Sequence, residues 1–492
     1  MALGQVQNDI LIFAMSSNIR HLSVKGIKWN AVECFLTQGI SFVVGIIVAR
    51  ILSPSDYGIV GMLAVFMAVS QVFVHSGFGA ALVRTQDRTV DDYATAFYFN
   101  VTTGALFYGI LFLTAPYIAA FYDMPILKDV LRVYAVTLII SALQIVPRTK
   151  LTVEVDFKSQ AIIGVMVALV SGTTSIWMAY SGYGVWTLVW QAIVSAALTT
   201  LSLWIVTHWK PWEGRFKRSS FNRLFSFGSN LLASSLLHII YKNVSTLVIG
   251  KFYTPADLGL YSRGQKISEL PSQYLASVVQ KVSYPVMSRL QDDNERLLQV
   301  YRKYLGMSSM VIFFLMVLLI AVAEPLVRIM LTEKWMGAVP YLRIFCLALM
   351  FDHVCSFNIN MMYVKGRSDL FFWLEIIKKV IVVPLVVLAI PCGVMAICFV
   401  PVVHEMVDLF IGTYCVRHTL GFRKASPLQD YGIYLLLALL ACVPAFLLCQ
   451  TGLSDWLVLF LGGGSALILY FVLLWRNENM REVVRIVRTE FV

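Results

Sequence analysis

The sequence is poor in charged residues, which make up only 14% of its 492 positions. Soluble domains carry about 25% charged and about 45–50% apolar residues, whereas apolar residues reach 59% here and the mean hydropathy is +0.75. So few charges cannot cover a water-soluble protein, and most of the chain must face lipid or other buried helices. The net charge is +11. On a membrane protein, such an excess of Lys and Arg usually lies in cytoplasmic loops and does not indicate a nucleic-acid partner. These properties exclude a soluble enzyme and a nucleic-acid binder.

Sequence motifs for metals, disulfides and nucleotides are also missing. The eight cysteines form no CxxC pair and no cluster with His, so we expect buried, unreactive thiols. The chain has no GxxxxGK[ST], no HExxH and no Gly-rich nucleotide loop, and its longest polar stretch, near 208–221, is too short for a catalytic domain. The sequence therefore predicts no enzyme, no metal and no cofactor, with energy drawn from an H⁺ or Na⁺ gradient or from substrate supply.

Fourteen segments are long and apolar enough to cross a bilayer, which takes about 20 residues per helix. Short connectors separate many of them, so neighbours in the sequence should run antiparallel. We predict an all-α, polytopic membrane protein with helices near 29–49, 58–82, 94–120, 129–147, 160–180, 183–207, 222–250, 259–288, 304–332, 340–363, 368–390, 393–416, 431–450 and 455–475.

The positions of Lys and Arg predict the orientation. With the N-terminus inside, the inner connections hold 26 of these residues and the outer ones hold 7. Such an excess marks the cytoplasmic side, so both termini are expected in the cytoplasm. Residues 1–14 precede a better start at Met15 and are too weakly apolar for a signal peptide, so we expect an over-called or disordered leader.

The two halves of the chain resemble each other. Residues 49–58, ARILSPSDYG, align with residues 250–259, GKFYTPADLG, and three further matches follow at nearly the same spacing. One such turn could recur by chance, whereas four in order favour a duplication, with parallel repeats around an axis along the membrane normal. We expect two pseudo-symmetric six-helix lobes plus two C-terminal helices, divided as follows: an N-terminal segment at 1–23, an N-lobe at 24–208, an inter-lobe loop at 209–222, a C-lobe at 223–418, helices 13 and 14 at 419–476, and a basic tail at 477–492.

Charged side chains inside predicted spans are candidates for function, because a charge in hydrocarbon is costly. Arg263, Lys266 and Glu269 share one face of the eighth helix, and Glu269 can pair with Lys266. Their alternative role is to reach the outer interface by snorkelling. Lys242 lies nine residues before Lys251, about 14 Å along a helix, and needs an anion or an acid as partner.

Acidic residues in three other spans, the first, tenth and twelfth, could carry protons or sodium. Glu33 shares a face of the first helix with Thr37 and Ser41, and Glu375 can pair locally with Lys378 or Lys379. The alternative is that such groups hold helices together by hydrogen bonds. The candidates for ion coupling or gating are Glu33, Glu269, Asp352, His353, Glu405 and Asp408.

Two segments carry a family resemblance. Residues 49–58 and residues 257–271, DLGLYSRGQKISELP, resemble the polysaccharide transporter branch of the MOP exporter superfamily, which contains the Wzx-like O-antigen and colanic acid flippases. The resemblance covers about residues 24–480, and Tyr261 to Lys266 is its most specific part. It implies transfer of an oligosaccharide on undecaprenyl pyrophosphate from the cytoplasmic to the periplasmic leaflet, for lipopolysaccharide, capsule or exopolysaccharide.

In that family, basic groups line the cavity and meet the substrate's head group. The resemblance assigns this role to Arg263 and Lys266, and to Arg50 and Lys251 at the repeat-related helix ends; Lys242 is added from its depth alone. It also implies a bacterial inner membrane protein among membrane lipids, with a polysaccharide polymerase and a chain-length regulator as further partners. We expect a monomer, because the two lobes already supply both halves of a cavity.

Three other functions compete with this one. A multidrug and toxic compound antiporter has the same two-lobe plan, but usually twelve helices and an acid-lined cavity. A membrane-embedded polysaccharide polymerase tends to have a long outer loop with catalytic Arg residues, whereas the outer connections here are short. A membrane scaffold has no positive sign in the sequence.

Overall fold

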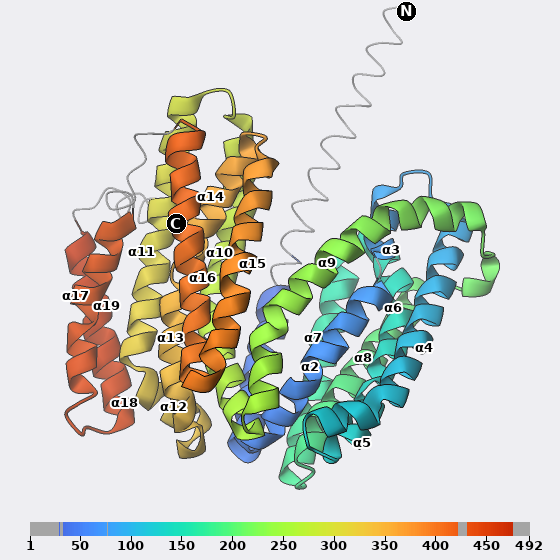
Figure 1. The fold of residues 1–492 in the computed structure, drawn as a ribbon, viewed down its shortest axis with the longest axis horizontal. Coiled ribbons are helices and arrows are strands. Elements are labelled where there is room, and N and C mark those ends of the chain that lie inside the picture. Colours follow the sequence, from blue (N-terminus) through green and yellow to red (C-terminus); the bar gives the residue numbers. More distant parts are fainter. Residues whose placement is uncertain (1–28, 30–32, 76, 422–430, 476–492) are drawn as a thin grey trace, which may run out of the picture. The chain divides into compact units, whose positions relative to one another are not determined.

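The computed structural model describes residues 29, 33–75, 77–421 and 431–475, and these form helices joined by short connections, with no strand (Figure 1). The chain divides into two compact units, residues 1–251 and 252–492. This division follows contacts, whereas the predicted lobes follow the sequence repeat, so the lobe boundaries stay a prediction. The expected N-terminal segment and the basic tail lie outside the described residues.

The first unit contains nine helices in its described part. They are Glu33–Ile51, α2 (Pro54–His75), α3 (Phe78–Arg84), α4 (Val90–Phe121), α5 (Ile126–Tyr134), α6 (Val136–Val153), α7 (Phe157–Tyr180), α8 (Val185–Thr207) and α9 (Arg218–Phe252). Helix α4 packs against α2 and α6, and α8 packs against α6 and α7. These contacts place α6, α7 and α8 around the polar cavity described below.

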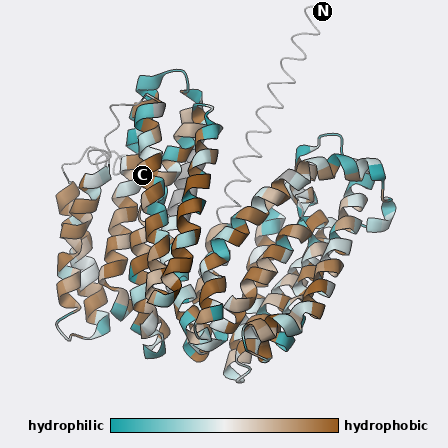
Figure 2. Ribbon diagram, viewed as in Figure 1, coloured by the Kyte–Doolittle hydropathy of each residue, from teal (hydrophilic) through white to brown (hydrophobic). Residues whose placement is uncertain are grey.

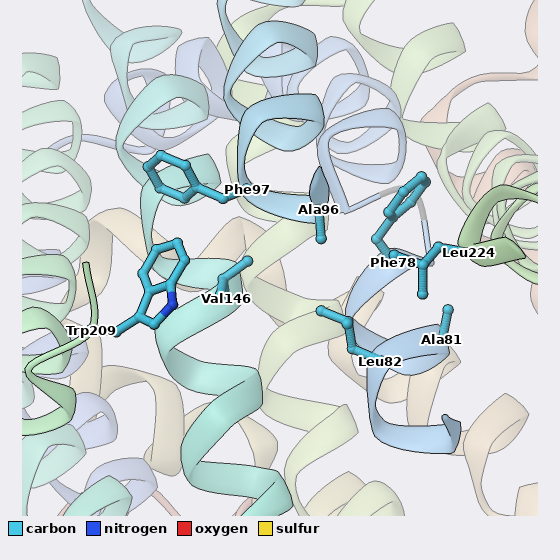
Figure 3. Close-up of a cluster of buried hydrophobic side chains, with 8 residues drawn as sticks. All are labelled: Phe78, Ala81, Leu82, Ala96, Phe97, Val146, Trp209 and Leu224. Carbon is cyan, nitrogen blue, oxygen red and sulfur yellow. The ribbon is translucent and has the colours of Figure 1, made fainter. Parts of the chain in front are cut away.

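A cluster of buried apolar side chains holds several elements of this unit together (Figure 3). It draws on α3, α4, α6, α9 and the loop after α8, through Phe78, Ala81, Leu82, Ala96, Phe97, Val146, Trp209 and Leu224. Asp92 anchors α9 beside it, because its carboxylate accepts two hydrogen bonds from Arg223, at 2.5 and 2.6 Å. The loop before α9 is fixed to the start of α4 as well, because the backbone N–H groups of Arg215 and Lys217 donate to Asp91 and Thr95.

The second unit contains the remaining helices of the described chain. They are α10 (Pro255–Arg289), α11 (Asn294–Ala321), α12 (Ala323–Leu331), α13 (Val339–Leu349), α14 (Asp352–Val364), α15 (Ser368–Ala389), α16 (Val394–Tyr414), α17 (Ile433–Leu448), α18 (Asp455–Leu457) and α19 (Gly463–Leu474). Helix α10 packs against α11, α13 and α14, and α16 packs against α13 and α15. The C-terminal helices α17 and α19 pack together, and α17 lies along α11.

The outer surfaces of these helices are apolar, as Figure 2 shows for most of them. Large side chains such as Leu113, Phe460 and Val472 are exposed. Helices suit this environment because each backbone N–H and C=O group is satisfied within its own segment. The protein is therefore a multi-pass membrane protein, and the all-α prediction is confirmed.

Each of the fourteen predicted segments forms one or two helices over its described residues, yet eleven described segments are long and apolar enough to count as membrane spans. The other three are α10, α15 and the shorter α17. The exact count of fourteen crossings therefore stays a prediction. The cysteine prediction was partly wrong, because five thiols are buried but Cys34 and Cys392 are exposed.

The two repeat-related turns have the same local structure. At the start of α2, the Ser53 hydroxyl and backbone N–H donate to Asp56, at 2.6 and 2.9 Å. At the start of α10, Thr254 makes the same two bonds to Asp257, at 2.6 and 3.2 Å. Both are capping boxes, which satisfy the free N–H groups of a helix start. The repeated Pro-x-Asp pattern thus has a structural cause in helix capping.

Candidate functional site

Three of the five basic candidates belong to the first unit. Arg50 ends the first helix and Lys242 lies on α9, and both side chains are exposed. Lys251, at the end of α9, is half-buried: its ammonium donates to the backbone carbonyl of Phe121, lies 3.4 Å from Asp123 Oδ2, and sits 4.9 Å from the centre of the Phe121 ring. Lys251 therefore ties α9 to the end of α4, while Arg50 and Lys242 present exposed charges.

The other two basic candidates lie on α10 in the second unit. Arg263 is half-buried, with its guanidinium 5.8 Å from the ring centre of the fully buried Trp335. Lys266 is exposed, one turn further along the helix. The predicted pair of Lys266 with Glu269 was wrong, because Glu269 accepts a hydrogen bond from the amide of Gln265 at 3.0 Å. A neutral amide thus satisfies the acid and leaves the charge of Lys266 at the surface.

Glu33 opens onto a polar cavity inside the first unit. The cavity has a volume of about 470 Å³ and lies between the first helix, α6, α7 and α8. Glu33, Thr37 and Ser41 all line it, which confirms that they share one face of the first helix. Opposite them lie the polar residues Arg148, Gln160, Ser171, Gln191, Ser195 and Thr199.

The remaining acidic candidates gather in the second unit, around a buried lysine. The ammonium of Lys378 on α15 contacts Glu375 and lies 2.9 Å from Asp408 Oδ2 on α16. Its side chain is 4% exposed and that of Asp408 is 6% exposed. Lys379 lies 3.7 Å from Glu375, which confirms the local pairing predicted from the sequence. The sequence did not predict that Asp408, thirty residues away, completes the pair.

Two carboxylate oxygens of this cluster, Glu405 Oε2 and Asp408 Oδ1, are buried without a hydrogen-bond partner among the described residues. Both residues lie beside Cys355 of α14, and one ligand atom from each of the three falls within 4.8 Å of the others. Asp352 of α14 lies within electrostatic range of Glu405 and Asp408. A proton or a small cation would relieve the repulsion among these acids.

His353 lies outside this cluster, although Asp352 precedes it in the chain. It is fully buried, its Nε2 lies 2.8 Å from the hydroxyl of Ser309 on α11, and its ring packs edge-on against Phe313 at 5.2 Å. The structure therefore gives His353 a packing position between α14 and α11. Consecutive residues on a helix point about 100° apart, which explains the separation.

Sequence reasoning missed the residues of the cavity that lie on α6, α7 and α8. Gln191, Ser195 and Thr199 repeat at four-residue spacing, as do Gln160, Gly164 and Ala168. That spacing is the signal that could have placed them on one helix face. Charged residues mark a candidate site more clearly than uncharged polar residues do, because a charge in hydrocarbon is far more costly.

The sequence comparisons give the family. The sequence model described as "Polysaccharide biosynthesis protein" matches residues 47–340, more than half of the chain. This chain belongs to the polysaccharide biosynthesis protein family. The membership confirms the resemblance to the polysaccharide transporter branch of the MOP superfamily, which rested on residues 49–58 and 257–271.

Curated relatives are similar to this chain over most of their length. The teichuronic acid biosynthesis protein TuaB of Bacillus subtilis is 22% identical, with 83% of this chain and 85% of TuaB covered. The succinoglycan biosynthesis transport protein ExoT of Rhizobium meliloti is 25% identical, with 72% of each chain covered. The lipopolysaccharide biosynthesis protein WzxC of Escherichia coli is 21% identical, with 75% of this chain and 76% of WzxC covered.

Solved structures share the fold. The lipid II flippase MurJ in an inward closed conformation matches with a TM-score of 0.74 at 13% identity, covering 94% of this chain and 99% of MurJ. An inward-facing multidrug transporter of the MATE family matches with a TM-score of 0.59 at 14% identity, covering 81% and 99%. At such identities the likeness concerns the fold alone, so the activity has to be argued from the residues.

Proposed function

We propose that this protein is a flippase that moves oligosaccharide repeat units, linked to undecaprenyl pyrophosphate, from the cytoplasmic to the periplasmic leaflet by alternating access. It would serve the synthesis of lipopolysaccharide O-antigen, capsule or exopolysaccharide in the bacterial inner membrane. Family membership and the names of its relatives, which concern teichuronic acid, succinoglycan and lipopolysaccharide, support the substrate class.

The single observation that carries the proposal is the polarity of α10. This helix has 35 residues, about 52 Å of length, which exceeds the roughly 30 Å of hydrocarbon. It nevertheless fails the apolarity expected of a membrane span. A helix of this kind is tolerated in a membrane where its polar face meets protein or water. Arg263 and Lys266 then offer cationic groups along a hydrated path.

Cationic groups are what the chemistry of such a substrate requires. A pyrophosphate that crossed bare hydrocarbon would lose its hydration at a prohibitive cost. Arg and Lys beside a hydrated path replace water as partners of the phosphate oxygens, while the lipid tail stays in the bilayer. Arg263 suits this task because its packing on Trp335 fixes the guanidinium and reduces the entropy lost on binding.

We further propose that an H⁺ or Na⁺ gradient drives the cycle through Asp352, Glu405 and Asp408. The two unpartnered carboxylate oxygens in this cluster support the assignment. Both termini are proposed to be cytoplasmic, and a polysaccharide polymerase would take up the product outside. The coupling proposal is tested by transport measured with and without each gradient.

The experiment is complementation of a flippase-null bacterial strain, scored by surface polysaccharide and by accumulated lipid-linked oligosaccharide. We expect rescue by the wild type and at least a tenfold loss with Arg263→Ala or Lys266→Ala, equivalent to about 1.4 kcal/mol per charge contact. Arg296→Ala is the matched control, because this exposed arginine pairs with Asp293 of its own helix start, at 3.3 Å.

Each outcome decides one claim. Rescue by all variants at equal membrane abundance would keep the flippase and reject the basic site on α10. Failure of the wild type, together with restored resistance to cationic dyes, would favour the multidrug or organic-cation antiporter instead.

A further inference from the structure

The polar cavity of the first unit has a composition that restricts what it can bind. It is lined by nine polar and eight apolar or glycine residues, and its volume is about 470 Å³. That volume falls in the range of small-molecule pockets, about 300–1,000 Å³, and far exceeds the roughly 30 Å³ of one water molecule. A single coordinated ion would leave most of it unfilled.

The charges in the cavity balance each other. Among the described residues that line it, Glu33 is the one acid and Arg148 the one base. Ca²⁺ or Mg²⁺ takes six or more oxygen ligands in close contact, and a guanidinium beside the one carboxylate would repel either cation. A pyrophosphate would meet one positive charge and one repelling carboxylate. The balance therefore favours an uncharged ligand.

The hydroxyl groups of the cavity present acceptors. Thr37, Ser171 and Thr199 each donate their hydroxyl proton to a backbone carbonyl of their own helix, at 2.6–2.7 Å. Their oxygens, like the Glu33 carboxylate, can then only accept hydrogen bonds from a ligand. Arg148 and the amides of Gln160 and Gln191 supply donors. The ligand must therefore both donate and accept, which sugar hydroxyls do and phosphate oxygens do not.

We propose that this cavity is a subsite for one uncharged sugar unit of the transported glycan. The aliphatic residues between the polar ones, such as Val167 and Leu188, would cover the C–H faces of the sugar ring. That the sugar belongs to a transported glycan rests on the proposed function, but the binding of a sugar can be measured without transport. It assigns Glu33 a hydrogen-bonding role in place of ion coupling.

The test is the protection of an introduced thiol in the full chain, purified in lipid nanodiscs. Ser195→Cys places the thiol in the cavity, and Ser181→Cys places a matched one on the exposed turn between α7 and α8. The exposed Cys34 and Cys392 are replaced by Ala. Alkylation by a water-soluble maleimide is timed with glucose, galactose or N-acetylglucosamine, with glycerol, and with inorganic pyrophosphate.

We expect at least one sugar, at about four times its Kd, to slow alkylation of Ser195→Cys about fivefold and to leave Ser181→Cys unchanged. Glycerol and pyrophosphate should have no effect. Protection by pyrophosphate alone, or by none of these probes, would overturn the proposal. Glu33→Gln should keep most of the protection and Glu33→Ala should lose it, whereas equal loss in both would return Glu33 to an ionic role.

A transport readout separates this proposal from the proposed function. Ala192→Trp fills the cavity, while Leu201→Trp places the same indole at an exposed position of α8. In the complementation assay, we expect loss of rescue of at least tenfold with the first variant and normal rescue with the second. Normal rescue by Ala192→Trp would reject the subsite and leave the flippase intact. Sugar protection without rescue by the wild type would keep the subsite and reject the flippase.

Discussion

The buried lysine of the second unit allows a quantitative prediction about stability. Lys378→Met keeps the length of the side chain and removes its charge. Asp408, whose side chain is 6% exposed, is then left as an uncompensated charge inside the helix bundle. Glu375 is 28% exposed and keeps Lys379 at 3.7 Å, so one stranded carboxylate dominates the loss.

Removing one partner of a buried ion pair costs about 3–5 kcal/mol, because the other partner keeps its desolvation penalty. We expect a loss of that size in the free energy of unfolding for Lys378→Met. The double variant Lys378→Met/Asp408→Leu removes both charges and should recover most of it, to within about 1 kcal/mol of the wild type. Replacing a buried pair by apolar residues is often neutral or stabilising.

The measurement is reversible unfolding in mixed micelles, analysed as a double-mutant cycle over the two residues. Lys379→Met is the matched control, because its side chain is 37% exposed, and it should cost at most about 1 kcal/mol. The reasoning would be refuted if Lys378→Met cost no more than Lys379→Met. Simple additivity in the double variant would refute it as well.

Two further predictions concern how the first unit holds its helices. Asp92→Asn removes the charge that accepts two hydrogen bonds from a guanidinium of α9, and unfolding should become easier by about 1.5–3 kcal/mol. Asp91→Asn, at a more exposed pair, should cost clearly less, because solvent screens its charge; equal effects would contradict this view. Gly77→Ala should lower the melting temperature well beyond Gly182→Ala. Both glycines have a positive φ, but a Cβ at Gly77 would lie 2.8 Å from Gly228 Cα, while a Cβ at Gly182 would meet open space. Equal melting temperatures would show that the backbone at Gly228 moves to make room for the methyl group.

Composition and periodicity were enough to predict the fold class. An apolar chain with few charges has to satisfy its backbone inside a membrane, so helices at the fourteen predicted segments follow from elementary constraints. The local pair of Glu375 with Lys378 was predictable for a similar reason, because residues three apart on a helix are neighbours. The face shared by Glu33, Thr37 and Ser41 follows from the same geometry.

Contacts between helices could not be predicted in this way. The partner of Lys378 is Asp408, thirty residues away on α16, and no periodicity within one helix identifies it. The same limit explains why His353 was grouped with Asp352, although its ring turns to Ser309 on α11. The cavity around Glu33 is assembled from four helices, and its lining could be recognised only after they were packed together.

The sequence by itself therefore determined the membrane environment, the helices and the family, since these depend on composition, local spacing and motifs. Tertiary structure alone decided which charges are neutralised and where a polar cavity opens. The reason is physical: whether a charge is tolerated in a bilayer depends on the groups that other helices bring within about 4 Å of it. Those groups come from distant parts of the chain.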